Sequence, residues 1–144
     1  MKVNIALLTV TDTRTFDNDK SGAILVDKIK ESNHNLLDRK LCKDNKDEIV
    51  LILKEWLKNE KIDAIITTGG TGLTGRDITP EALDEIADKH IPGFGEVFRN
   101  ISIKSVGTSA IQSRACAVLA NGKYVFALPG SSGGVTDAWD QILK

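Results

Sequence analysis

The residues best suited to chemistry gather in one glycine-rich segment, residues 67–80. Its four glycines let the backbone curl so that several N–H groups can point at one ligand oxygen. The hydroxyls of Thr68, Thr71 and Thr74 and the guanidinium of Arg76 add donors that suit a phosphate. The segment has neither the Lys-Ser/Thr ending of a P-loop nor the Gly-x-Gly-x-x-Gly spacing of the dinucleotide fingerprint. We therefore predict an anion cradle made by Thr68, Gly69, Gly70, Thr71, Gly72 and Arg76.

A carboxylate, Asp77, follows this cradle directly. A negative side chain beside a phosphate is electrostatically unfavourable unless a cation lies between the two. Mg²⁺ prefers oxygen ligands and is commonly shared between protein carboxylates and substrate phosphates, so Asp77 is a candidate Mg²⁺ ligand. Thr79 as N-cap and Pro80 at the first helical position predict a helix whose N-terminus adds a favourable dipole for an anion.

Two other turns follow strand-like runs. Residues 11–14 supply hydroxyls, a carboxylate and a guanidinium, and residues 129–134 again place glycines and hydroxyls where a strand gives way to a helix. Two glycine-rich strand-to-helix junctions in one small chain are more than packing requires. From the second junction we select Pro129, Gly130 and Ser131 as ligand contacts.

Residues 92–96 read Pro-Gly-Phe-Gly-Glu and are open to two interpretations. In one, the segment is a turn between helices, with Phe94 in the core. In the other, Glu96 accepts hydrogen bonds from the N–H groups of a flat heterocycle that lies against the glycine backbone. The ligand contacts of the second interpretation are Pro92, Gly93, Gly95 and Glu96.

Strand and helix patterns alternate through most of the chain. Asn45 and Glu48 form a capping-box pattern, and the apolar residues that follow have helical spacing. Asn121-Gly122 separates two strand-like runs and is a strong hairpin signal. Strands are expected at residues 3–10, 36–42, 64–68, 115–120 and 123–128. Helices are expected at residues 21–31, 45–57, 79–89, 96–102, 109–114 and 134–143.

This alternation predicts an α/β fold, a three-layer α/β/α sandwich whose sheet is mostly parallel with one antiparallel hairpin strand. Ligands of such folds sit beyond the carboxyl ends of the strands. The chain has 144 residues, a length typical of one domain, so we treat residues 1–144 as a single domain.

Composition excludes several classes of protein. The formal net charge is −1 and no basic stripe is present, so nucleic acid is not an expected partner. No apolar run is long enough to span a bilayer, and the N-terminus has no signal-peptide pattern, so a cytoplasmic protein without membrane contact is expected. Cys42 and Cys116 are expected to be small buried hydrophobes, and His34 and His90 to be surface residues.

Five motifs follow one another along the chain: Thr68-Gly69-Gly70-Thr71-Gly72, Arg76-Asp77-Ile78-Thr79-Pro80-Glu81-Ala82, Pro92-Gly93-Phe94-Gly95-Glu96, Ser113-Arg114 and Leu128-Pro129-Gly130. Their order and spacing resemble the MoaB/Mog family of molybdopterin-binding proteins, and the likeness covers essentially the whole chain. The detail of residues 107–115 resembles the MoaB branch most closely.

The resemblance implies molybdenum cofactor biosynthesis. Such proteins bind molybdopterin, and active members are molybdopterin adenylyltransferases, nucleotidyltransferases that transfer AMP from Mg-ATP to its terminal phosphate. It assigns catalysis and Mg²⁺ binding to Asp77 and Asp44, although the loop around Asp44 departs from the family pattern and Asp47 competes for that role. Ser113 and Arg114 become ligand contacts. The nucleophile is a phosphate that is already ionised, so no general base is required.

Two alternatives stay open. One is a binding protein of the same pathway that holds molybdopterin or its precursor without catalysis, and the other is a generic nucleotide-binding domain. The resemblance also implies a homotrimer or homohexamer and the downstream molybdate-inserting protein as a partner, with Trp56, Phe98 and Trp139 either at an interface or in the core. Family members usually run beyond Lys144, which leaves open a missing C-terminal tail.

Overall fold

The computed structural model describes residues 2–143 and contains one six-stranded sheet of order β2-β1-β3-β6-β5-β4. Strands β2, β1, β3 and β6 pair in parallel, and β5 pairs antiparallel with both of its neighbours. The mostly parallel sheet with one antiparallel hairpin strand is therefore confirmed. The strands are β1 (Asn4–Val10), β2 (Asn35–Cys42), β3 (Ala64–Thr68), β4 (Lys89–His90), β5 (Cys116–Ala120) and β6 (Lys123–Leu128).

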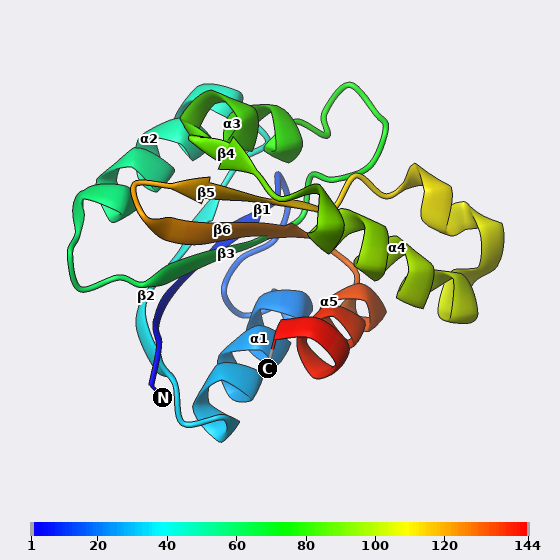
Figure 1. The fold of residues 1–144 in the computed structure, drawn as a ribbon, viewed down its shortest axis with the longest axis horizontal. Helices are drawn as coiled ribbons and strands as arrows, with labels where there is room; N and C mark the ends of the chain where they lie inside the picture. Colours follow the sequence, from blue (N-terminus) through cyan, green and yellow to red (C-terminus); the bar gives the residue numbers. More distant parts are fainter. Residues whose placement is uncertain (1, 144) are drawn as a thin grey trace.

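Helices cover both faces of this sheet, which gives the three expected layers (Figure 1). Helices α2 and α3 lie on one face, and α1, α4 and α5 lie on the other. The helices are α1 (Lys20–Glu31), α2 (Lys46–Lys58), α3 (Thr79–Ile86), α4 (Pro92–Val106) and α5 (Ser132–Ala138). A 3₁₀ helix, η1 (Gly107–Gln112), follows α4, and a π-helical turn, η2 (Trp139–Leu143), follows α5.

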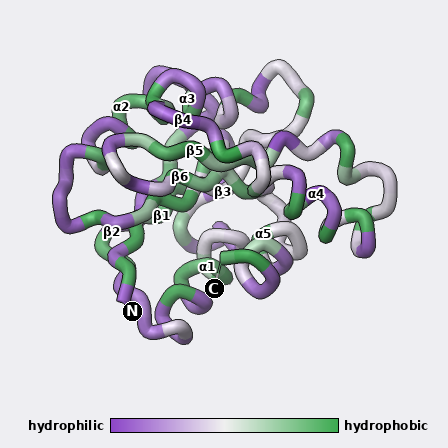
Figure 2. Tube along the Cα trace, in the orientation of Figure 1, coloured by the Kyte–Doolittle hydropathy of each residue, from purple (hydrophilic) through white to green (hydrophobic). Residues whose placement is uncertain are grey.

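The central strands are rich in hydrophobic residues, as the hydropathy colouring in Figure 2 shows, and these residues contribute to a core cluster on each face of the sheet. In β1, Leu8 packs under α2 and α3, whereas Leu7 packs under α1, α4 and α5, because successive side chains of a strand point to opposite faces. Trp56, Phe98 and Trp139 are all buried in these two core clusters. Their interpretation as core residues is the one that the structure supports.

Local sequence signals explain two of the element ends. The side chain of Asn45 accepts a hydrogen bond from the backbone N–H of Glu48 at 3.1 Å and caps α2 as expected. Asn121 and Gly122 both have positive φ, 49° and 74°, which is the backbone of a tight β-hairpin turn. The capped helix and the hairpin are therefore confirmed.

The region after the glycine-rich segment differs from expectation. Helix α3 is capped at Ile78, not Thr79, because the Thr79 hydroxyl donates to the carbonyl of Gly69 at 2.9 Å instead of capping the helix. It ends at Ile86, since the two residues of β4 pair with β5. Helix α4 then begins at Pro92, four residues earlier than expected, with proline in its first turn.

His34 is also not simply a surface residue. Its Nδ1 accepts a hydrogen bond from the backbone N–H of Val3 at 3.0 Å, and its ring meets Trp139 edge-on at 6.4 Å. His90 is exposed, as expected. Among residues 2–143, no helix combines the length and the apolar character that a membrane crossing requires.

Candidate functional site

A cavity of about 730 Å³ opens at the carboxyl edge of the sheet, where parallel strands end together. The loops after β1, β3 and β6 form most of its wall, and Asp44 reaches it from the end of β2. Of the ligand contacts selected from the sequence, those that line it are Asp44, Thr68, Gly69, Gly70, Thr71, Gly72, Arg76, Asp77, Ser113, Pro129, Gly130 and Ser131. Residues as far apart in the sequence as Thr9 and Ser131 thus meet in one site.

The turn after β3 needs glycine at two successive positions. Gly69 and Gly70 have φ of 101° and 73°, a region that side-chain-bearing residues rarely adopt. A Cβ on Gly69 would lie 2.3 Å from the carbonyl oxygen of Val10, and one on Gly70 would lie 2.3 Å from the hydroxyl of Thr79. The backbone of this turn is therefore packed directly against its surroundings and faces the cavity.

Asp77 lies across this turn and is held by Thr74. Its Oδ2 accepts hydrogen bonds from the backbone N–H of Thr74 at 3.0 Å and from the Thr74 hydroxyl at 2.7 Å. Burial alone would raise the pKa of Asp77, but the hydrogen bonds from Thr74 and Gly72 and the charge of Arg114 lower it below the ordinary value. Asp77 is therefore a carboxylate at neutral pH.

Asp44 is the second carboxylate of the cavity. Burial raises its pKa, and the negative charge of Asp77 raises it further, so the two carboxylates interact. Asp47 is exposed in the first turn of α2 and is not part of the cavity wall. The structure thus brings Asp44, and not Asp47, to Asp77.

A divalent cation fits this donor set. Two neighbouring carboxylates repel each other, and a cation between them would remove that repulsion. Within residues 2–143, no three metal-ligating side chains of the His, Cys, Asp or Glu type gather at one point. Mg²⁺ is usually held by one or two carboxylates, and its remaining coordination positions are left for water and substrate phosphates. The pair of carboxylates in this cavity matches that arrangement better than a metal site enclosed by protein.

Cationic side chains also reach the cavity. Arg76 pairs with Asp12 across the mouth and is 71% exposed. Arg14 donates from Nη1 to the hydroxyl of Ser21 at 3.2 Å and to the carbonyl of Gly130 at 3.4 Å. The sequence pointed to the turn that holds Asp12 and Arg14, but we selected neither residue, because nothing local to that turn shows which other loops it meets.

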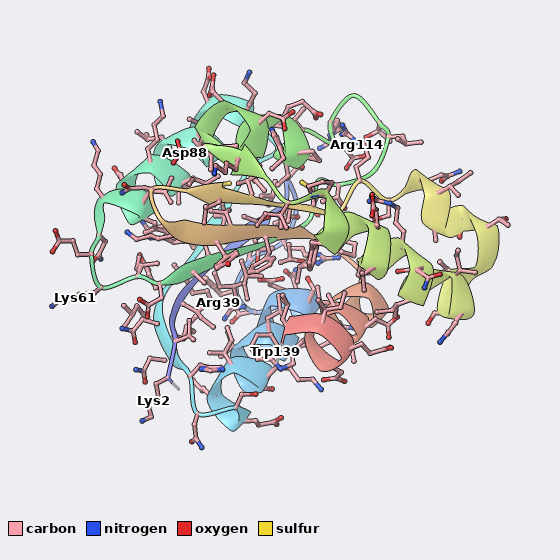
Figure 3. All side chains as sticks on the ribbon, in the orientation of Figure 1. Lys2, Arg39, Lys61, Asp88, Arg114 and Trp139 are labelled. Atoms are coloured by element: carbon pink, nitrogen blue, oxygen red, sulfur yellow. The ribbon has the colours of Figure 1, made fainter. Side chains whose placement is uncertain are left out.

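Arg114 was expected to contact the ligand, and the structure gives its guanidinium other partners. The side chain lies beside the loop between β3 and α3 in Figure 3. It pairs with both carboxylate oxygens of Glu81 and donates to the carbonyls of Gly72 and Asp77. It is not part of the cavity wall, and the Glu81 partner could not be read from the sequence because 33 residues separate the two.

The segment around Phe94 lies apart from this cavity. Phe94 is buried against Phe126, with ring centroids 5.2 Å apart, so the structural interpretation of the segment is correct for this side chain. Pro92, Gly95 and Glu96 instead line a separate cavity of about 190 Å³, and Gly93 faces open space. The structure therefore does not bring these four predicted ligand contacts to the glycine turns within one chain.

A second large cavity adjoins the first. It has a volume of about 600 Å³ and lies between α4, η1 and the start of α5. Ser113, Pro129 and Ser131 line both cavities and so form their common border. Serine hydroxyls, small residues and the ring of Phe98 make up much of the second wall.

Comparison with known proteins identifies relatives along nearly the whole chain. A family model described as "Probable molybdopterin binding domain" matches residues 6–144. "Molybdenum cofactor biosynthesis protein B" of Escherichia coli (strain K12) is 41% identical over 139 residues, which cover 96% of this chain and 82% of the relative. The protein of the same description from Staphylococcus aureus (strain MRSA252) is 44% identical over 145 residues, covering 99% and 86%.

Solved structures agree with this assignment. A crystal structure of "Molybdenum cofactor biosynthesis protein B" superposes with a TM-score of 0.96 at 40% identity, covering 99% of this chain and 89% of that chain. The "tungsten cofactor synthesizing protein MoaB" of Pyrococcus furiosus superposes with a TM-score of 0.87 at 34% identity, covering 98% and 90%.

Proposed function

The chain belongs to the MoaB family of molybdopterin-binding proteins of molybdenum cofactor biosynthesis, and we propose that it adenylylates the terminal phosphate of molybdopterin with Mg-ATP. The observation that carries this proposal is the meeting of Asp44 and Asp77 beside a glycine turn that presents backbone to the same cavity. A protein that only held an anion would gain nothing from two carboxylates there. They make sense where a metal–nucleotide complex binds.

The reaction joins two anions. An oxygen of the molybdopterin phosphate attacks the α-phosphorus of ATP, a new P–O bond forms, and the bond from the α-phosphorus to the bridging oxygen breaks, so that pyrophosphate leaves with the electron pair. The nucleophile is already ionised and no proton has to be removed. The protein therefore has to align two phosphates and reduce their repulsion.

The residues of the cavity divide these tasks. Asp77 and Asp44 would hold Mg²⁺, which when bound supplies positive charge to the phosphates. Backbone N–H groups of the turn at Gly69 and Gly70 would donate to phosphate oxygens, and the guanidiniums of Arg14 and Arg76 lie at the rim for further contacts.

The adjoining cavities support the binding of two substrates side by side. We assign the charged cavity of about 730 Å³ to the phosphates and nucleotide, and the cavity of about 600 Å³ to the pterin. Their common border at Ser113 and Ser131 is then where the two substrates react. Pro92, Gly93, Gly95 and Glu96 remain proposed ligand contacts, and they would have to act at a second cavity or through another subunit of a homotrimer or homohexamer.

The second candidate is a non-catalytic molybdopterin-binding protein. Arg76 and Arg114 favour it, since both guanidiniums pair with carboxylates of the protein, which lowers the positive charge available to a triphosphate. A binding protein needs less of that charge than an enzyme that stabilises a transferring phosphoryl group.

The test is to incubate the protein with molybdopterin and Mg-ATP and to follow adenylyl-molybdopterin and pyrophosphate together. Both products in equal amounts are expected, and both should disappear when Mg²⁺ is chelated. Tight binding of molybdopterin in calorimetry without either product would favour the binding protein. Binding of ATP without binding of molybdopterin would contradict both candidates.

A further inference from the structure

Arg114 connects both ends of the loop that carries Asp77. Its backbone N–H donates to the carbonyl of Thr71 at 2.8 Å, and its Nε donates to the carbonyl of Gly72 at 2.8 Å. Its Nη2 donates to the carbonyl of Asp77 at 2.6 Å. One residue thus holds the start and the end of the segment 72–77.

Glu81 fixes the plane of this guanidinium. Its two carboxylate oxygens accept from Nη1 and Nη2 of Arg114, which is the paired geometry that a planar guanidinium forms with a carboxylate. Glu81 lies in the first turn of α3 and is anchored there by the helix. The chain of contacts therefore runs from α3 through Arg114 to the loop.

Besides Arg114, the segment is held by the hydrogen bonds between Thr74 and Asp77 within it and by the ion pair of Arg76 with Asp12. Other parts of the segment lie in open surroundings. Leu73 is 65% exposed, and a Cβ on Gly75 would have no neighbour within 4 Å. The Asp77 carboxylate, by contrast, packs closely against the backbone of Gly72, since its Oδ2 lies only 2.8 Å from where a Cβ of Gly72 would be. Thr74 holds the Asp77 carboxylate within the loop, but where that carboxylate lies relative to the cavity depends on the backbone at Gly72 and Asp77, and Arg114 bonds to the carbonyls of both.

We infer that Arg114 is a positioning residue, which sets the place of the Asp77 carboxylate by holding the backbone of residues 71–77, and that it does not bind substrate phosphate itself. The consequence for catalysis rests on the proposed adenylyl transfer, whereas the effect on the loop does not. Lysine distinguishes the two roles, because an ammonium can replace a guanidinium as a charge near phosphate but cannot donate in a fixed plane to two carbonyls and a carboxylate.

The first measurement is amide hydrogen exchange of the full chain without any ligand. Both Arg114→Lys and Arg114→Gln should accelerate exchange in peptides that cover residues 71–78 by about tenfold or more, while peptides of α2 keep the wild-type rate. Arg99→Lys is the matched control, because Arg99 donates to the carbonyls of Ser113 and Ala115 next to Arg114 and the structure gives it no hydrogen bond to the loop. It should leave residues 71–78 unchanged.

Wild-type exchange of residues 71–78 in Arg114→Lys would overturn the inference. If Arg114→Gln fails to fold, Glu81→Gln tests the same contact chain with a smaller change, and unchanged loop exchange in that variant would equally contradict the role. These results need no enzymatic activity, so they stand apart from a failure of the proposed function, which would show as absent turnover in the wild type.

The second measurement separates positioning from general damage. In adenylyl transfer, Arg114→Lys should raise the Mg²⁺ concentration for half-maximal rate by about tenfold and lower kcat, with KM for molybdopterin within about threefold of wild type. The Arg114→Lys variant should be no more active than the Arg114→Gln variant. A lysine variant with near wild-type kcat, or a loss confined to KM for molybdopterin, would instead identify a direct phosphate contact.

Discussion

The carboxylate of Asp12 and the backbone of Asp44 are joined across two neighbouring loops: Asp12 Oδ1 accepts a hydrogen bond of 3.0 Å from the Asp44 N–H. The other oxygen of Asp12 pairs with Arg76 on the glycine-rich loop. One side chain in the loop after β1 therefore fixes residues from the loops after β2 and β3. A substitution of Asp12 should therefore change the position of the Asp44 backbone, although Asp12 itself is not a proposed metal ligand.

Asp12→Ala is expected to lower kcat/KM for adenylyl transfer about tenfold, because Asp44 loses the acceptor that holds its backbone. Asp12→Asn keeps an acceptor oxygen for that N–H and should lose only about threefold. Asp17→Ala removes an exposed carboxylate from the same loop and is the control that should change nothing. Equal losses in the Ala and Asn variants would show that the contact to Asp44 is not what matters.

The carboxylate pair gives a second prediction. If Asp44 and Asp77 hold one metal ion, Asp44→Ala, Asp77→Ala and the double variant should all lose about the same activity, because the first removal already disables the unit. Asp47→Ala should keep near wild-type turnover, since Asp47 is exposed on α2. Multiplicative losses in the double variant would mean that the two carboxylates act independently.

The sequence was sufficient for features whose causes are local. Asn45 and Glu48 are three residues apart, and Asn121 and Gly122 are neighbours, so the cap of α2 and the hairpin could be predicted from short patterns. The glycine turn was equally clear, because positive φ at Gly69 and Gly70 requires that residue type. The meeting of three loops could be predicted from the mostly parallel sheet, because the carboxyl ends of parallel strands lie at the same edge.

Features made by distant residues could not be predicted in the same way. Strand β4 has two residues and exists because β5 offers a backbone partner about 29 positions away. Asp19 is fully buried, and its partner Arg39, at 3.2 Å, comes from β2. Arg114 looked like a phosphate contact from its motif, and only the fold shows Glu81 beside it. In each case the deciding contact joins segments that sequence spacing does not relate.

The glycine turn gives a third prediction. Gly70→Ala combines a disfavoured φ with a Cβ that would lie 2.3 Å from the Thr79 hydroxyl and 3.4 Å from Asp44. We expect a loss of stability of about 1 to 3 kcal/mol in thermal unfolding and at least tenfold weaker molybdopterin binding in calorimetry. Gly75→Ala adds the same methyl group where a Cβ has no neighbour within 4 Å, and it should retain both properties. A tightly binding Gly70→Ala protein would argue against close contact between turn and ligand.

A fourth prediction concerns Cys116. Burial, with a smaller contribution from the charge of Asp84, raises the pKa of its thiol from 9.0 to about 11. A raised pKa means less thiolate at pH 8, so iodoacetamide should alkylate native Cys116 at least about a hundredfold more slowly than the urea-unfolded chain. Cys42→Ser leaves this one thiol for mass spectrometry. The native rate should keep rising with pH up to about pH 11, and levelling near pH 9 would contradict the raised pKa.

Thr79 gives the last prediction, because its two interpretations require opposite chemistry. As an N-cap, Thr79 would accept a hydrogen bond, and aspartate would serve at least as well. In the structure the buried hydroxyl donates to the carbonyl of Gly69, and a carboxylate at that position would repel the carbonyl oxygen. Thr79→Ser should therefore stay near wild-type stability. Thr79→Val should lose about 1 to 3 kcal/mol in denaturant unfolding, since a buried carbonyl is left without its donor. Thr79→Asp should lose more than Thr79→Val and should also weaken molybdopterin binding, because the same hydroxyl packs against Gly70. An aspartate variant as stable as wild type would return Thr79 to the helix cap and leave the Gly69 carbonyl without a role in shaping the turn.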